Sequence, residues 1–264
     1  QIILNTVSSI KKAEQSLNII YEDLLKSMYD NNQLITKNIE KLNFEKSIIF
    51  QNVSFKHKGQ NHEILSNINI EIFKNQKIAI IGKTGVGKST FIDLFTGLLS
   101  PTKGSIFVDQ KILDYKNNYS WFDNLSYIPQ KIFFTGDSLI ENISLGKLEK
   151  LHDMKKIDES LNFSELKYSN NINNTTKEIK EGGKNLSGGE KQRLGIARAY
   201  YHDRNILILD ESTNAIDSST EEKIIHKILK LDKTVLFISH NTKYLKKFEK
   251  IIFFDNNKNI IFDT

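Results

Sequence analysis

One nine-residue segment has the residue types and the spacing of a loop that binds phosphate groups. It fits the pattern G-x-x-x-x-G-K-[ST] and consists of Gly82, Lys83, Thr84, Gly85, Val86, Gly87, Lys88, Ser89 and Thr90. A buried strand predicted over 77–81 precedes it and a helix predicted over 89–99 follows it, which is the context that this pattern requires. Glycines let backbone N–H groups turn toward the phosphates, and the start of the helix adds a positive field. Lys88 is therefore expected to contact β- and γ-phosphates, and Ser89 to ligate the Mg²⁺ ion that bridges them.

A second segment supplies carboxylates. The apolar run 205–209 predicts a buried strand, and Asp210 and Glu211 follow it directly. Asp210 at this position would hold magnesium through water. Glu211 would polarise an attacking water as general base. Strands that end in acids are common, so this interpretation depends on the phosphate loop in the same chain.

A third segment, 186–199, begins with Ser187, Gly188 and Gly189 and continues as a helical pattern. Read alone, it is a loop followed by a helix N-cap. The first turn of such a helix offers a hydroxyl and bare backbone amides, and local sequence alone does not say what these groups face.

Composition limits the classes of protein to which the chain can belong. Its 264 residues are 39% hydrophobic, which is enough for a full core. The net charge of +5 comes from dispersed lysines without a dense basic block, so nucleic acid is not expected as a partner. The chain has no cysteine, which excludes disulfides and thiolate metal sites. It also has no apolar run of about 18 residues that would span a bilayer. The chain begins with Gln1 and shows no signal-peptide pattern, so we expect a piece of a longer protein.

The elements that must position these segments fall into two predicted regions. In region 1–45, an apolar stripe predicts an amphipathic helix, followed by a linker near 29–45. This helix either packs on its own domain or continues an upstream element. In region 46–264, strand-like runs at 48–50, 53–55 and 68–72 precede the phosphate loop. The stripe consists of Ile3, Val7, Ile10, Leu17, Ile20 and Leu24.

Together with these segments, several short motifs make region 46–264 resemble the nucleotide-binding domain of ATP-binding cassette (ABC) transporters. They are Gln130 in YIPQ, EGG at 181–183, LSGGE at 186–190, STNAID at 212–217 and His240 in FISH. The resemblance implies an α/β fold with a RecA-like parallel-sheet core, an antiparallel β subdomain and a helical subdomain over about 131–199. It also implies ATP and Mg²⁺ as the bound groups.

The resemblance assigns further roles. Ser187, Gly188 and Gly189 would cap the γ-phosphate of a second copy in a head-to-tail dimer. His240 would contact the γ-phosphate. Gln130 would reach the magnesium and the attacking water, and would link the site to a transmembrane domain.

Three positions depart from the family pattern or have a structural alternative. Glu190 stands where the signature usually has glutamine, and Asn214 begins a segment where the family often has Ser-Ala-Leu-Asp. The position that usually stacks an aromatic ring on adenine is His57, which can also be read as an exposed loop residue. Phe55 is the fallback for stacking, although it suits a strand core better. Trp121 is expected to pack only.

The assignment to the exporter branch of the family rests on two segments. The EGG segment and the run FFTGDSLIENISLG at 133–146 both resemble the corresponding segments of exporters. The resemblance implies ATP hydrolysis coupled to export or flipping, at the cytoplasmic face of a bacterial inner membrane. The N-terminal helix and YIPQ are similar to those of lipid-linked oligosaccharide flippases, while peptide and lipid exporters stay open. A stand-alone importer ATPase is an alternative. A soluble ABC ATPase of DNA repair, chromosome structure or translation is another.

Overall fold

The structure, a computed structural model, describes residues 14, 17, 18, 20–24, 41–60, 62–114, 117–166, 178–255 and 260–263. It divides into two compact units, Gln1–Lys41 and Leu42–Thr264. The division lies close to the boundary predicted between 45 and 46. Among the described residues, no helix is both long enough and apolar enough to cross a bilayer.

In the first unit, the described residues between 14 and 24 are helical. Three members of the predicted apolar stripe, Leu17, Ile20 and Leu24, are more than half exposed. The other members, Ile3, Val7 and Ile10, lie outside the described residues, as does the predicted linker between 29 and 40.

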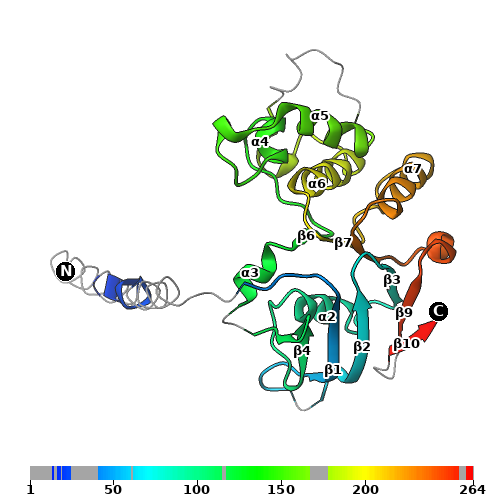
Figure 1. Ribbon diagram of the computed structural model, residues 1–264. Coiled ribbons are helices and arrows are strands. Elements are labelled where there is room, and N and C mark those ends of the chain that lie inside the picture. The colour runs from blue at the N-terminus through cyan, green and yellow to red at the C-terminus, as the bar shows by residue number, and fades with distance from the viewer. Residues whose placement is uncertain are drawn as a thin grey trace, which may run out of the picture. The chain divides into compact units, whose positions relative to one another are not determined.

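The second unit contains an antiparallel sheet of four strands in the order β2-β1-β4-β5 (Figure 1). The sequence predicted two short strands at 48–50 and 53–55, but the structure joins them into one strand. That strand is irregular at Asn52, whose φ of 50° is tolerated by asparagine. The neighbouring strand has glycine at position 104, next to this irregularity. A Cβ there would lie 2.3 Å from the Asn52 carbonyl oxygen, so no larger residue fits. The strands are β1 (Ser47–Phe55), β2 (Leu65–Phe73), β4 (Lys103–Val108) and β5 (Lys111–Ile112).

A six-stranded sheet in the order β10-β9-β3-β8-β7-β6 forms the centre of the unit. Strands β9, β3, β8, β7 and β6 pair in parallel, and β10 pairs antiparallel with β9. Strands β3, β7 and β8 are nearly continuous apolar runs, as expected for parallel strands covered on both faces. The predicted α/β class, with a parallel core and an antiparallel sheet, is confirmed. The bounds are β3 (Lys77–Gly82), β6 (Leu125–Ile128), β7 (Ile206–Asp210), β8 (Thr234–Ile238), β9 (Lys250–Phe254) and β10 (Ile260–Asp263).

Helix α2 (Lys88–Phe95) starts directly at the phosphate loop and packs into the main core, which both sheets share. It ends four residues before the predicted end at 99, because the chain turns at Gly97, where φ is 77°. Trp121 in α3 (Asn118–Phe122) is fully buried against Phe44 and Phe95. Its packing role is as expected.

A separate group of helices stands beyond β6 and β7 (Figure 1). Helices α4 (Leu139–Ile143), α5 (Met154–Phe163) and α6 (Gly188–His202) share their own apolar core, which includes Ile143, Ile157 and Leu194. Short 3-10 turns flank these helices, η1 (Glu149–Leu151) and η3 (Glu181–Gly183). Helix α7 (Ser218–Leu229) connects β7 to β8, and η4 (Thr242–Lys247) follows β8.

Candidate functional site

The phosphate loop joins β3 to α2 in a conformation that depends on glycine. Gly82, Gly85 and Gly87 have φ values of 151°, 83° and 108°. A Cβ would lie 2.8 Å from the Phe254 carbonyl oxygen at Gly82, and 2.9 Å from Leu65 Cδ2 at Gly87. Side chains are therefore excluded from the positions where the backbone must turn its N–H groups inward.

Lys88 lies across this loop. Its ammonium donates hydrogen bonds to the carbonyl oxygens of Gly82, at 2.7 Å, and Lys83, at 2.9 Å. Burial lowers the pKa of the Lys88 ammonium, and the carboxylates of Glu211 and Asp210 oppose that shift. The cation is thus held inside the loop and within electrostatic reach of both acids.

A cavity of 480 Å³ opens at this loop and brings together segments that are far apart in the sequence. The phosphate loop contributes one wall, and β7 contributes the two acids at its end. Gln130, which follows β6, contributes a third part, and residues before β2 contribute a fourth. The lining residues are Gln60, His62, Ile64, Thr84, Gly85, Gly87, Lys88, Ser89, Thr90, Gln130, Asp210 and Glu211.

Asp210 ends β7, and Tyr127 of the neighbouring strand β6 holds its carboxylate. The Tyr127 hydroxyl donates to Asp210 Oδ2 at 2.9 Å. Burial raises the pKa of Asp210, the hydrogen bond from Tyr127 opposes this rise, and the nearby Glu211 adds to it. The strand register pairs Tyr127 with Ile208, so a long side chain on β6 reaches Asp210 two positions further along β7.

Glu211 has the left-handed φ of 50°, and its N–H donates to the Ile238 carbonyl oxygen at 3.0 Å. Its carboxylate receives a hydrogen bond from Gln130 Nε2 at 3.1 Å and lies 2.6 Å from His240 Nε2. Three side chains that the sequence predicted as a catalytic set are therefore in direct contact.

The oxygen groups at the cavity fit a magnesium ion. Ser89 offers a hydroxyl, Asp210 a carboxylate and Gln130 an amide oxygen, and all three line the same cavity. Mg²⁺ prefers such oxygen ligands and takes its remaining ligands from water and substrate phosphates. Among the described residues, no group of three or more His, Cys, Asp or Glu side chains forms a separate metal site.

In the loop before β2, the residues that line the cavity are not the one that the sequence predicted. His57 is exposed and packs edge-on against Phe55, with ring centroids 5.1 Å apart, and it does not line the cavity. His62 and Ile64 line it instead, and Ile64 lies against Gly87 of the phosphate loop. The role of His57 at the adenine stays a prediction. Sequence reasoning missed His62 because a lone histidine in a polar loop carries no recognisable pattern.

Ser187 is the N-cap of α6, and a reciprocal capping box closes around it. Its hydroxyl accepts from the Glu190 N–H at 3.3 Å, and Glu190 Oε2 accepts from the Ser187 N–H at 2.8 Å. The Glu190 carboxylate, which departs from the family pattern, thus stabilises the start of the helix.

Gly188 and Gly189 bring α6 close to the segment that follows Glu211. A Cβ would lie 3.1 Å from Ala215 Cβ at Gly188, and 2.9 Å from the Ala215 carbonyl oxygen at Gly189. The Ala215 N–H donates to Gln192 Oε1 at 2.7 Å, and this hydrogen bond also holds the segment around Ala215 close to α6. Ser187, Gly188 and Gly189 do not line the cavity, so a single chain does not bring them to the phosphate loop.

Comparison with known proteins agrees with this geometry. The sequence model described as "ABC transporter" matches residues 65–214. The chain is 32% identical to the lactococcin-G-processing and transport ATP-binding protein LagD of Lactococcus lactis subsp. lactis, over 97% of this chain and 36% of that protein. It is 34% identical to the ATP-dependent lipid A-core flippase of Wigglesworthia glossinidia brevipalpis, over 80% of this chain and 37% of that protein.

A solved structure agrees as well. A bacterial Atm1-family ABC exporter with ATP bound superposes with a TM-score of 0.75 at 26% identity, over 89% of this chain and 43% of that one. The chain spans 34% to 43% of the length of LagD and of two further curated relatives, each of which matches it over almost all of its own length. Because the family's sequence model covers more than half of the residues and the fold and site agree with it, the chain belongs to the ABC transporter family and has the ABC ATPase fold.

Proposed function

We propose that the chain is the ATP-binding and ATP-hydrolysing domain of an ABC exporter. The observation that carries the proposal is the meeting of Lys88, Ser89, Asp210 and Glu211 at one cavity, with Gln130 and His240 both in contact with Glu211. A phosphate loop beside an oriented carboxylate is what phosphoryl transfer to water needs.

The residues divide the chemistry among them. Backbone N–H groups of the loop and the Lys88 ammonium bind the phosphates of ATP. Ser89, Gln130 and Asp210 would hold Mg²⁺, which neutralises charge that develops on the phosphate oxygens. Glu211 accepts a proton from the attacking water, and His240 orients Glu211 and contacts the γ-phosphate. Tyr127 keeps the Asp210 carboxylate in place.

A second copy of the chain would complete the site. Ser187, Gly188 and Gly189 lie at the N-terminus of the fifteen-residue helix α6, where amide N–H groups and the helix dipole favour an anion. Their separation from the cavity of their own chain supports a head-to-tail dimer in which they contact the γ-phosphate of the partner. ATP would then lie between two copies and hold them together.

The remainder of the proposal concerns the longer protein. The relatives are processing and transport proteins or flippases that are more than twice as long as the matched region, which supports a transmembrane domain as a further partner. The helical group exposes Phe133, Leu148, Leu151 and Met154, each at least 45% exposed, which suits docking of that domain. We place the chain at the cytoplasmic face of a bacterial inner membrane. The proposed cargo is a lipid-linked oligosaccharide, another lipid or a peptide. The relatives named for lactococcin G and for the lipid A-core support a peptide or a lipid.

Phosphate release from Mg²⁺-ATP tests the proposal. The chain at high concentration should hydrolyse ATP, and both Lys88→Ala and Glu211→Gln should abolish most of this activity. An activity that both variants retain would overturn it.

A further inference from the structure

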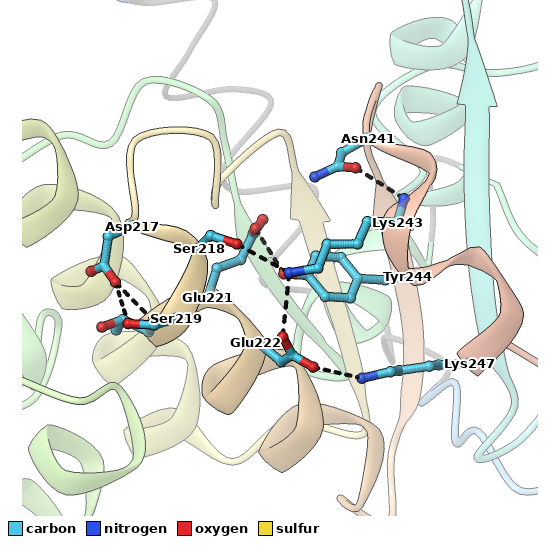
Figure 2. Close-up of polar contacts among 10 residues, drawn as sticks. Asp217, Ser218, Ser219, Glu221, Glu222, Asn241, Lys243, Tyr244 and Lys247 are labelled. Atoms are coloured by element: carbon cyan, nitrogen blue, oxygen red, sulfur yellow. Dashed lines mark hydrogen bonds and ion pairs between the residues drawn. The ribbon is translucent and has the colours of Figure 1, made fainter.

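Two turns that carry site residues are joined through one buried carboxylate, that of Glu221 in the first part of α7. Glu221 Oε1 accepts a hydrogen bond from the Thr213 hydroxyl at 2.8 Å. Its Oε2 accepts one from the Tyr244 hydroxyl at 3.1 Å (Figure 2). Thr213 follows Glu211 by two residues, and Tyr244 follows His240 by four. Glu221 therefore contacts both segments that present the Glu211–His240 pair.

The connection is shielded from water. Thr213 and Tyr244 are each 1% exposed, and Glu221 is 7% exposed. Burial raises the pKa of the Tyr244 hydroxyl, so it keeps its proton and remains a donor. Hydrogen bonds from hydroxyls to a buried carboxylate are strong and directional, because neither partner can turn to water instead.

Around this buried centre lies a surface layer of ion pairs between η4 and α7. Lys243 Nζ contacts the Ser218 hydroxyl at 3.0 Å and Glu222 Oε2 at 3.3 Å, and Lys247 Nζ lies 3.6 Å from Glu222 Oε1 (Figure 2). These side chains are 40% to 52% exposed, so solvent screens their attraction. The Lys243 and Lys247 ammonium groups also lie over the Tyr244 ring, 4.9 Å and 5.6 Å from its centroid. The control position is therefore Glu222, the acid of these pairs on α7.

Tyr244 lies only four residues after His240, so the position of Tyr244 affects the position of His240. Asn241 caps η4 by accepting a hydrogen bond from the Lys243 N–H at 2.9 Å, and its own N–H donates to the Ser239 hydroxyl at 2.9 Å. With three residues between them in a capped turn, a shift of Tyr244 moves the backbone that carries the His240 ring.

We propose that Glu221 is a positioning residue that holds His240 at its working distance from Glu211 by accepting hydrogen bonds from Thr213 and Tyr244. The inference rests on the proposed function, since it takes Glu211 and His240 as the groups that act on ATP. A misplacement of about 1 Å in a catalytic group can reduce a rate by about 10²-fold.

The variant Tyr244→Phe removes one hydroxyl and keeps the buried ring. We expect kcat for ATP to fall about tenfold while KM stays within about twofold, because geometry rather than binding is lost. Glu222→Gln weakens the surface pairs with Lys243 and Lys247 and should leave kcat unchanged. In a His240→Ala background, Tyr244→Phe should reduce kcat no further, since the residue through which it acts is gone. Equal loss in both backgrounds would overturn the proposal.

A second readout needs no ATP. The ring ¹⁵N signals of His240, identified by their loss in His240→Gln, report its contact with Glu211. In Tyr244→Phe these signals should move toward those of Glu211→Gln, whereas Glu222→Gln should leave them in place. Unmoved signals in folded Tyr244→Phe would overturn the positioning role. Should Tyr244→Phe fail to fold, Thr213→Val removes the other hydroxyl and is read in the same way. A wild-type chain without ATPase activity would contradict the proposed function. The ring signals would still show whether Glu221 positions His240 relative to Glu211.

Discussion

His240 Nε2 lies 2.6 Å from Oε1 of Glu211, at the ends of two neighbouring parallel strands. The other carboxylate oxygen of Glu211 accepts a hydrogen bond from Gln130 at 3.1 Å. Each oxygen thus has its own side-chain partner from a different segment. The orientation of the Glu211 carboxylate is therefore set by these two side chains.

Replacing Glu211 by glutamine keeps its size and removes its capacity to accept a proton. We expect Glu211→Gln to bind ATP as the wild type does and to hydrolyse it about 10² to 10⁴ times more slowly. Phosphate release under saturating Mg²⁺-ATP measures the rate. Glu222→Gln is the matched control, because this exposed acid on α7 lies outside the cavity. A folded Glu211→Gln with undiminished turnover would remove Glu211 from the role of base.

Lys88→Ala removes the ammonium that lies inside the phosphate loop. ATP affinity should fall at least about tenfold, because the phosphates lose a charge-assisted contact in a partly desolvated site. Titration with a fluorescent ATP analogue measures the loss. Lys74→Ala, an exposed lysine in the turn after β2, should bind like the wild type. Near-normal affinity in folded Lys88→Ala would refute the assignment of the loop.

The cavity predicts that the nucleoside end of ATP meets His62. His62→Ala should weaken ATP binding by about 1 kcal/mol, since an imidazole ring that packs on a base or ribose contributes about that much. Binding of inorganic triphosphate, which has no base or ribose, should not change. His57→Ala and His57→Tyr test the position expected from sequence. Weakening in His57→Ala alone, with tighter binding in His57→Tyr, would move the base contact to His57.

The dimer interface can be tested with a variant that retains ATP. In Glu211→Gln, ATP persists at the interface and should shift the chain toward a dimer by mass action. Adding Ser187→Arg should reverse the shift, because a large side chain at the start of α6 blocks the approach to the γ-phosphate. Light scattering at high protein concentration distinguishes the two. A dimer that survives Ser187→Arg would contradict the composite site.

Asp217 caps α7, and its stabilising effect should depend on pH. Hydrogen bonds from the Thr220 N–H and the Ser219 hydroxyl lower its pKa to about 2. Because the pKa in the folded chain lies below the unfolded value of about 3.9, the charged form stabilises the fold above pH 4, and this effect is lost as the pH falls toward 2. Asp217→Asn keeps an N-cap without the charge. Its Tm should be lower than that of the wild type by about 1 to 3 °C at pH 7 and equal to it near pH 2. A Tm difference that does not vary with pH would contradict this account.

The sequence predicted the parts of the site that lie within one contiguous segment. The phosphate loop carries its glycines, lysine and hydroxyls in nine residues, and Asp210–Glu211 follows its own strand, so local spacing sufficed. The start of α6 at Ser187 was also predictable, because an N-cap depends on neighbouring residues only.

Contacts between distant segments were beyond local reasoning. Tyr127 meets Asp210 through the register of β6 with β7, and His62 reaches the cavity through the path of a loop. The contact of Tyr244 with Glu221 requires η4 to pack on α7, which no pattern in either segment indicates. The length of α2 was overestimated because helical periodicity continues past Gly97 while the backbone does not.

The close packing of α6 on Ala215 also determines which substitutions are tolerated at Gly188 and Gly189. A methyl group at 188 would press on the Ala215 side chain, and glycine at 215 would relieve that contact. A methyl group at 189 would press on the Ala215 carbonyl oxygen, which every residue type at 215 retains. Position 188 is therefore open to compensation by a second substitution, whereas position 189 is not. Two adjacent glycines that look equivalent in the sequence therefore differ in the substitutions that they can accept during evolution.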